Sequence, residues 1–461
     1  MRAAIPLVLV TTLSVAPLAA QTQEGWRQYA SPDEAGFSAG ELEAARVFAD
    51  SVGSGAVLAV YRGRVLAAWG EVARRIPAHS VRKSLVSALY GIATAGGHVH
   101  LDATLGELGI DDDTGLSAGE KAATVRDVLS SRSGVYLPAA YAPAEQDETR
   151  PARGAHAPGT HWFYNNWDFN VAGAIYERAT QTNLFEAFDS LIAGPIGMED
   201  YTPADGHVVI EPSRSRHPAH TFDISARDLA RFGQLYLQNG RWGDRQVLPA
   251  SWVRESTRAH SDFGAGTGYG YMWWTYAPGS LGDAYPHLDQ HELYMGRGTG
   301  GQAVYIIPGA DLVIVHRADT ENGRAVRGFH VWQIAERIVA AREREPAAVP
   351  ALIELTSTPL ASQLPEATRP AFIELDAASR ARVTGTYELA AGVDIRVFLF
   401  EGRPFINVPG EGEAEMYAVS PLEFRLRVEP GVRIRFETDA AGNIVGVVLR
   451  LGAREMHAAR R

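Results

Sequence analysis

The chain has 461 residues, of which 46% are hydrophobic and 21% are charged, and its formal net charge is −11. Such a composition is typical of globular proteins with a large core, and the length predicts two or three domains. The net negative charge argues against nucleic acid and anionic membranes as partners, because both attract basic surfaces. The chain has no cysteine, which excludes disulfides, a thiol nucleophile and thiolate-bound metal.

Residues 1–20 have the pattern of a secretory signal peptide. Arg2 precedes an apolar run from Ile5 to Leu18, and two small residues, Ala19 and Ala20, follow it. The run is shorter than the roughly 20 apolar residues that cross a membrane, and no later stretch reaches that length. We therefore expect cleavage near Ala20 and a soluble mature protein that is periplasmic or secreted.

Residues 21–345 are predicted to form one α+β domain with strands near both ends and helices in the middle. Apolar residues at helical spacing and short β-rich runs give the individual elements. In chain order we expect strands at 57–61 and 65–69, helices at 80–97, 124–131, 170–180 and 225–239, strands at 303–307 and 312–316, and a helix at 328–344. Residues 136–160 have no such period, and we interpret them as a long functional loop.

The region after residue 345 differs from the preceding domain in composition and in the spacing of its apolar residues. Residues 346–370 contain five prolines and few charges, which predicts a linker. Residues 371–461 contain seven short alternating runs separated by turn residues and no helical pattern. Evenly spaced strands of this kind predict a small all-β domain, either an up-and-down barrel or a sandwich.

The two lysines stand out, because arginine supplies the other 41 of the 43 basic residues. A lysine amine can lose its proton at an accessible cost, and a guanidinium cannot. Lys83 follows Ser80 by three residues in a predicted helix, so both side chains lie on one face. A serine hydroxyl is a poor nucleophile until a base takes its proton. To act as that base, Lys83 needs a pKa lowered from about 10.4 to about 7, which costs about 4–5 kcal/mol. The alternative for Lys83 is a solvated helix lysine, which is our interpretation of Lys121.

Two further motifs fit a site around Ser80. Tyr164-Asn165-Asn166 stands on a turn before a helix and offers a phenol that relays a proton and an amide that holds a carbonyl. The glycine-rich run 296–302 enters a strand, whereas a dinucleotide-binding run follows a strand and opens a helix. Glycines in this place let an acyl group lie against the backbone, with an N–H aimed at its oxygen. A tight turn between two strands is the alternative.

Together, Ser80-x-x-Lys83, Tyr164-x-Asn166 and the glycine run resemble the serine β-lactamase and penicillin-binding-protein-like hydrolases. The resemblance is greatest to the branch near class C β-lactamases, esterases of that fold and 6-aminohexanoate-dimer hydrolase. It covers roughly residues 30–340 and includes the segments 128–134, 228–233, 268–274 and 301–308. The C-terminal region resembles the lipocalin-like domain often appended to such hydrolases. The resemblance implies an antiparallel sheet with a helical subdomain.

The resemblance also implies roles for individual residues. Ser80 would be the acylated nucleophile, and Lys83 would be the general base or would hold Tyr164 ionised as the base. Tyr164 would protonate the leaving group, and Asn166 would bind the acyl side of the substrate. The oxyanion hole would combine the N–H of Ser80 with one from the glycine strand, most naturally Thr299. The substrate-binding set is therefore Asn166, Gly298, Thr299, Gly300 and Gly301, with no metal or cofactor. The family's third motif carries Lys or His, and this run has neither, although Arg297 offers a positive charge.

These observations predict an exported serine hydrolase that cleaves ester or amide bonds of small acyl substrates. One alternative is a D-amino-acid peptidase or β-lactamase that acts on peptidoglycan-like or β-lactam substrates. The other alternative is an inactive relative that keeps the cleft for binding. The sequence does not predict the oligomeric state.

Overall fold

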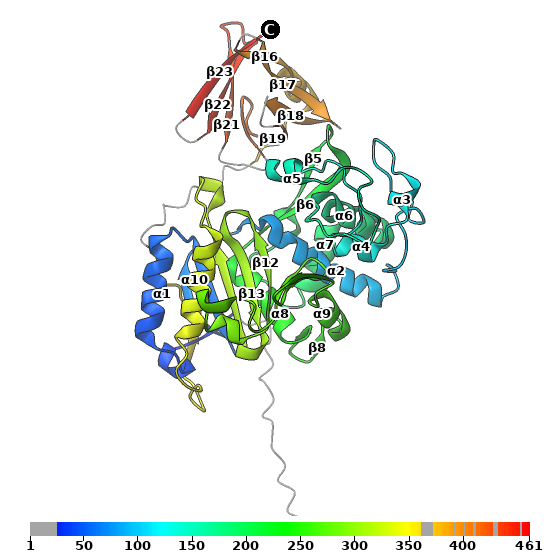
Figure 1. Cartoon of the computed structure of the whole chain (residues 1–461). Coiled ribbons are helices and arrows are strands. Elements are labelled where there is room, and N and C mark those ends of the chain that lie inside the picture. The colour runs from blue at the N-terminus through cyan, green and yellow to red at the C-terminus, as the bar shows by residue number, and fades with distance from the viewer. Residues whose placement is uncertain are drawn as a thin grey trace, which may run out of the picture.

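The computed structural model describes residues 25–360, 372–390, 392–400, 402–408, 412–426, 432–451 and 454–461. The predicted signal peptide and residues 361–370 of the predicted linker lie outside this range. Figure 1 shows a larger domain of helices around a sheet, with a small barrel at one end of it. Within the described ranges, no helix combines the length and the apolar character needed to cross a bilayer.

A ten-stranded sheet organises the larger domain, and strands from both ends of the domain meet in its centre. There β14 lies between β2 and β13. All neighbouring strands are antiparallel except β1 and β3, which are parallel. The sheet was predicted to be antiparallel, and this one pair makes it a mixed sheet. In sheet order the strands are β15 (Leu352–Glu354), β1 (Arg27–Tyr29), β3 (Arg64–Gly70), β2 (Ala56–Tyr61), β14 (Leu312–Arg317), β13 (Gln302–Ile307), β12 (Leu293–Gly298), β11 (Trp274–Tyr276), β10 (Thr267–Tyr269) and β9 (Ser261–Gly264).

Helices cover both faces of this sheet, which is why its central strands are apolar on both sides. Along β2, Val57 and Ala59 pack toward α1 and α10, whereas Leu58 and Val60 pack toward the helices on the other face. Figure 1 shows α1 and α10 on one side of β12 and β13, with the remaining labelled helices of the domain on the other side.

The helical side holds the residues of interest. Its main helices are α2, α6 and α8, which form one apolar cluster with the sheet. Among the described residues, the α-helices are α1 (Ala39–Ser51), α2 (Arg82–Ala95), α3 (Ala118–Lys121), α4 (Val125–Leu129), α5 (Ala144–Thr149), α6 (Asn166–Thr180), α7 (Leu184–Phe188), α8 (Ala226–Leu237), α9 (Ala250–Ser256), α10 (Gly328–Ala340) and α11 (Ala377–Arg382). The strands on this side are β4 (Ile76–Pro77), β5 (Gly206–Glu211), β6 (Ser215–Ile224), β7 (Arg241–Trp242) and β8 (Arg245–Gln246).

The larger domain continues beyond the predicted boundary at residue 345. The strand β15 pairs with β1, and Thr358 forms a bridge with Trp69. The segment 346–360, predicted as linker, is therefore partly an edge of the sheet. A three-residue strand flanked by prolines has too few residues to show an alternating pattern, so its sequence resembles a linker.

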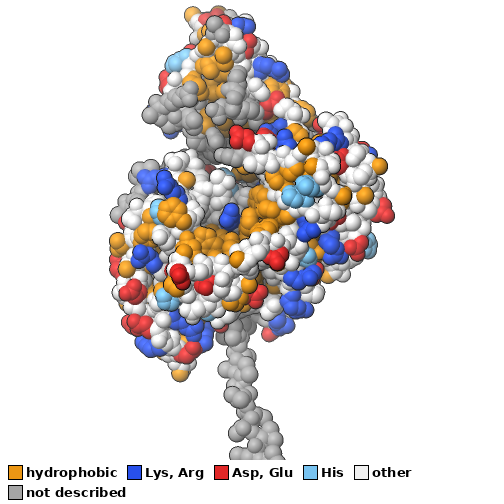
Figure 2. Space-filling model, in the orientation of Figure 1, with side chains coloured by type: hydrophobic (Ala, Val, Ile, Leu, Met, Phe, Trp, Pro, Cys, Tyr) orange, Lys and Arg blue, Asp and Glu red, His pale blue; other side chains and the backbone are white. Residues whose placement is uncertain are grey.

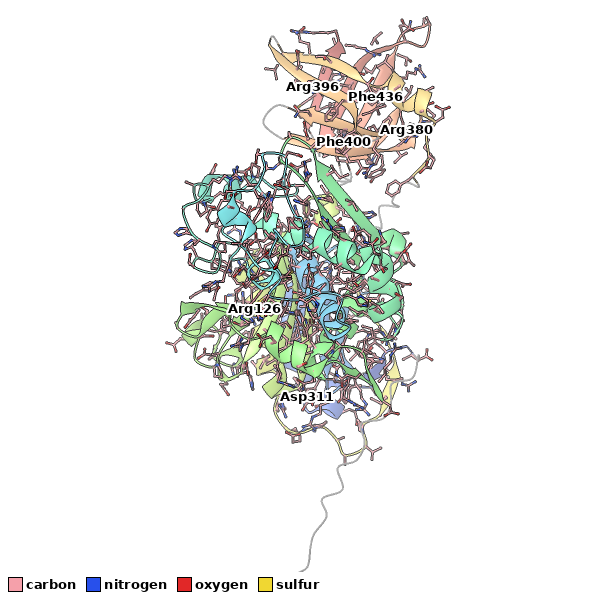
Figure 3. All side chains as sticks on the ribbon, turned by 90° about the vertical axis from the view of Figure 1, so that its right-hand side faces the viewer. Arg126, Asp311, Arg380, Arg396, Phe400 and Phe436 are labelled. Atoms are coloured by element: carbon pink, nitrogen blue, oxygen red, sulfur yellow. The ribbon has the colours of Figure 1, made fainter. Side chains whose placement is uncertain are left out.

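The C-terminal domain is a closed antiparallel barrel of eight strands. Its strands are β16 (Gly385–Ala390), β17 (Val393–Phe400), β18 (Arg403–Val408), β19 (Gly412–Ser420), β20 (Glu423–Leu426), β21 (Arg433–Thr438), β22 (Ile444–Leu451) and β23 (Arg454–Arg460). The barrel has its own core, to which Tyr387 and Phe436 contribute, and Figure 3 labels Phe436 there. The prediction of a barrel is confirmed, with one strand more than predicted because the polar strand β23 lacks an alternating apolar pattern. The expectation that the region contains no helix is wrong, because the six-residue helix α11 precedes β16. The lipocalin resemblance stays a prediction.

Candidate active site

Ser80 lies on a sharp turn between β4 and α2. The preceding residue, His79, adopts a left-handed backbone conformation (φ 46°), which non-glycine residues rarely do. A 3-10 turn, His79–Val81, then leads into α2. Because Ser80 lies two residues before the first residue of α2, the positive end of the helix dipole lies close to its hydroxyl and favours negative charge there.

Lys83 lies in the first turn of α2, as the three-residue spacing predicted. Its Nζ is 2.8 Å from Ser80 Oγ and 2.7 Å from the hydroxyl oxygen of Tyr164. The side chain is only 2% exposed, and Nζ lies 4.5 Å from the centre of the Phe169 ring. Burial, followed by the charge of Arg82, holds the pKa of Lys83 well below its usual range. In the described part of the chain, no carboxylate pairs with this amine, so its neutral form is favoured.

Tyr164 is the third member of the cluster formed with Ser80 and Lys83, and it lies two residues before the start of α6. Its ring stacks on Trp274, with 5.7 Å between the ring centres. Burial raises the pKa of Tyr164, while contact with the Ser80 hydroxyl and the charges of Arg82 and Arg297 lower it. Because the net shift is upward, the phenol keeps its proton at neutral pH. Of the two predicted bases, the electrostatics thus favour the Lys83 amine over a Tyr164 phenolate.

The glycine run forms the turn between β12 and β13 and also lies against Ser80. Gly298 ends β12, and a Cβ atom built on it would be 2.7 Å from Ala78 O and 2.9 Å from Ser80 N. Only glycine allows the strand to approach the nucleophile this closely. Gly300 and Gly301 then have φ of 76° and 98°, which make the turn. Both interpretations of this run, a turn and a backbone wall beside Ser80, are therefore compatible.

Behind this turn, His316 holds the carbonyl of Gly301. Its Nδ1 is 2.6 Å from Gly301 O, and its Nε2 is 2.8 Å from Ser54 Oγ. Burial lowers the pKa of His316 to about 4, so the imidazole is neutral and each ring nitrogen has one partner. No sequence motif predicts this support, because Ser54 is far from His316 along the chain.

A cavity of about 660 Å³ opens at Ser80. Tyr164 and the glycine run line it beside Ser80, so every predicted site residue except Lys83 and Asn166 is in its wall. The rest of the wall is largely aromatic and aliphatic, with two arginines; it includes Trp274, Tyr305, Val331, Trp332, Arg297 and Arg327. Figure 2 shows hydrophobic side chains on both sides of a basic side chain over the middle of this domain.

Asn166 is not among the residues that line the cavity. It is buried, and its Nδ2 donates a hydrogen bond to Tyr141 O at 2.9 Å. Tyr141 belongs to the predicted 136–160 loop, whose only regular element in the described structure is the short helix α5. The structure thus brings Asn166 to this loop, and a contact of Asn166 with substrate stays a prediction.

Two loops are joined through His79, which the sequence did not indicate. Its Nδ1 is 2.8 Å from the Tyr141 hydroxyl, and its Nε2 is 2.9 Å from Thr320 Oγ1. Burial, followed by the charge of Arg317, lowers the pKa of His79 to about 4. The neutral ring therefore connects loops on either side of Ser80.

The second lysine is on the surface as predicted, with Lys121 Nζ 2.6 Å from Asp111 Oδ2.

The packing of α2 behind a mixed sheet, with the glycine turn at the strand ends beside Ser80, defines the β-lactamase/transpeptidase-like class of folds. The model of the beta-lactamase family matches residues 42–335, which is more than half of the chain. The chain therefore belongs to the beta-lactamase family, as the resemblance predicted.

Individual relatives are more distant. Esterase EstB of Burkholderia gladioli is 44% identical over 64 residues, which are 14% of this chain and 15% of EstB. A putative 6-aminohexanoate-dimer hydrolase from Bacillus anthracis has a similar structure, with 20% identity, a TM-score of 0.49, and coverage of 64% of this chain and 81% of that one. EstCE1, a hydrolase with promiscuous acyltransferase activity, has 16% identity, a TM-score of 0.49, and coverage of 67% and 99%.

Proposed function

We propose that this chain is an exported serine hydrolase that cleaves ester or amide bonds of small acyl substrates through an acyl-enzyme on Ser80. The observation that carries this proposal is the buried amine of Lys83, 2.8 Å from the Ser80 hydroxyl at the end of a cavity. Membership of the beta-lactamase family and the local identity with an esterase support it.

In acylation, Ser80 Oγ attacks the substrate carbonyl and its proton passes to the neutral Lys83 amine. The N–H groups of Ser80 and Thr299 stabilise the negative charge that develops on the carbonyl oxygen. As the tetrahedral intermediate collapses, the Tyr164 hydroxyl protonates the departing oxygen or nitrogen, and Lys83 returns a proton to Tyr164. The products of this step are the acyl-enzyme and the free alcohol or amine.

In deacylation, water attacks the acyl carbonyl and gives a proton to Lys83. The bond to Ser80 Oγ then breaks, and that proton returns to the serine through Lys83. Lys83 is neutral again at the end of the cycle. The 2.7 Å and 2.8 Å contacts of its Nζ with both hydroxyls allow these transfers without a large movement.

A panel of p-nitrophenyl esters, nitrocefin and peptides ending in D-Ala-D-Ala tests the proposal. We expect release of p-nitrophenol from short-chain esters, and loss of that release in Ser80→Ala. Equal rates for the wild type and Ser80→Ala would contradict the proposal. Binding of these compounds without turnover would instead favour the alternative of an inactive binding relative.

One observation favours the second candidate, a peptidase or β-lactamase for substrates that carry a carboxylate. Arg297 and Arg327 both line the cavity and are exposed, and Arg297 lies 4.3 Å above the Trp274 ring. Among the described residues, neither arginine forms an ion pair with an acid. Two such cations offer a place for an anionic group of the substrate.

This candidate predicts a substrate-dependent effect of Arg297→Ala. A lost charge-assisted contact should raise KM about 10- to 100-fold for nitrocefin or a D-Ala-D-Ala peptide, and should leave the KM for neutral p-nitrophenyl acetate unchanged. Steady-state kinetics on both substrate classes measure this, with Arg245→Ala on β8, away from the cavity, as the control. A similar change for charged and neutral substrates would exclude a carboxylate contact at Arg297.

A further inference from the structure

Arg82 is a buried cation without a buried anion beside it. The side chain is 1% exposed, and one nitrogen, Nη2, donates to Asn170 Oδ1 at 3.2 Å. The guanidinium carbon lies 5.8 Å from the centre of the Tyr141 ring, and Nε is buried without a hydrogen-bond partner. In the part of the chain that the structure describes, no Asp or Glu forms an ion pair with Arg82.

This burial is costly, because a guanidinium keeps its proton and buried charges are normally paired. The titratable groups that act on Arg82 are three tyrosine hydroxyls, those of Tyr141, Tyr164 and Tyr269. Phenols are neutral at ordinary pH, so they leave the charge of Arg82 uncompensated. An apolar side chain of similar volume would be easier to bury, which indicates that the charge itself has a use.

The field of Arg82 acts at close range on Lys83. The two residues are consecutive on α2, and their side chains contact consecutive residues of α6: Arg82 contacts Asn170, and Lys83 contacts Phe169. Two buried cations on neighbouring residues repel each other strongly, because the protein interior screens charge less than water does. Lys83 can remove this repulsion by losing its proton, and Arg82 cannot.

We propose that Arg82 is a positioning residue that acts through Lys83, a fixed buried positive charge that keeps the Lys83 amine unprotonated and ready to accept the Ser80 proton. Its effect on Lys83 does not depend on the reaction, whereas its catalytic consequence rests on the function proposed above. The charge of Arg82 is the second cause, after burial, of the lowered pKa of Lys83.

Other groups around the amine do not replace this charge. These groups are either neutral or, in the case of Arg297, lie in the wall of the cavity and act on the pKa of Tyr164. They are Tyr164 and Asp168 at the start of α6, Tyr269 on β10, Arg297 on β12 and His79 before α2. Burial raises the pKa of Asp168 well above its usual range, which favours its neutral form, and it is hydrogen-bonded to Ser133 rather than to Lys83.

Removing the charge should therefore raise the pKa of Lys83. In Arg82→Gln and Arg82→Met we expect an increase of about one pH unit. Because catalysis needs the neutral amine, the acid limb of kcat/KM should move to higher pH by the same amount. Activity on that limb should fall about tenfold, while the plateau at higher pH stays unchanged.

The two lysines of the chain make a direct measurement simple. Protein labelled with [ε-¹³C]lysine gives two resonances, which Lys121→Arg assigns, and each is titrated by NMR. In Arg82→Gln and Arg82→Met, the midpoint of Lys83 should rise and that of Lys121, the internal control, should not. A loss of packing alone would reduce activity without moving the Lys83 midpoint.

The outcomes separate this inference from the proposed function. An unchanged Lys83 midpoint in whichever of the two variants folds would overturn the inference, even if the enzyme is active. A raised midpoint in a protein that hydrolyses no ester would support the inference and count against the hydrolase. A raised midpoint with a shifted acid limb would support both.

Discussion

Replacing Lys83 by arginine is expected to lower kcat/KM for p-nitrophenyl esters by about 10²- to 10⁴-fold, the usual contribution of a general base. Arginine keeps a positive charge at this position, but it cannot give up its proton at any pH that the protein tolerates. The base is thus lost while the charge is kept. Initial rates over a range of pH measure the effect.

Lys121→Arg is the matched control, because it makes the same change at a half-exposed lysine that pairs with Asp111. It should retain wild-type activity. Near-normal rates in Lys83→Arg at neutral pH would refute the role of Lys83 as proton acceptor. Loss of activity in both variants would point to a general effect of the substitution rather than to the site.

Gly298→Ala is expected to lower kcat by about 10²- to 10³-fold, the usual cost of losing one oxyanion-hole donor. The added Cβ would lie 2.7 Å from Ala78 O and 2.9 Å from Ser80 N, and both atoms belong to the backbone of the turn that carries Ser80. Either this turn or β12 must withdraw, which moves Thr299 N–H and Ser80 N–H apart. Measurements of kcat and of the melting temperature separate the catalytic from the structural effect.

Gly40→Ala serves as the control, because Gly40 lies on the exposed side of α1 with no atom closer than 3.9 Å to its added Cβ. Alanine in a helix should leave stability unchanged or slightly increased. Full kcat in Gly298→Ala would show that the close approach of β12 to Ser80 is not needed for turnover.

Local spacing was sufficient to predict the core of the site. Ser80 and Lys83 meet because the helix that begins after Ser80 places residues three apart on one face, and this follows from the chain alone. Tyr164 was found through its motif and the family resemblance. The glycine run was predicted as a turn or a backbone wall, and it is both because β12 and β13 form a hairpin beside Ser80.

Contacts between segments that are distant along the chain could not be predicted from the sequence. Asn166 is turned toward the 136–160 loop, and the position of that loop depends on its contacts with His79 and other distant residues. The strand β15 is assigned by its pairing with β1, more than 300 residues away, rather than by its own three residues. The burial of Arg82 likewise depends on how α6 packs on α2, which the spacing of residues along one helix does not predict.

The central claim is that Ser80 is the nucleophile, and its adduct with a covalent inhibitor tests this most directly. Intact mass spectrometry of the protein after incubation with a fluorophosphonate should show one adduct per chain on the wild type, mapped to Ser80, and none on Ser80→Ala. The absence of an adduct on the wild type, or an adduct that persists on Ser80→Ala, would contradict the account.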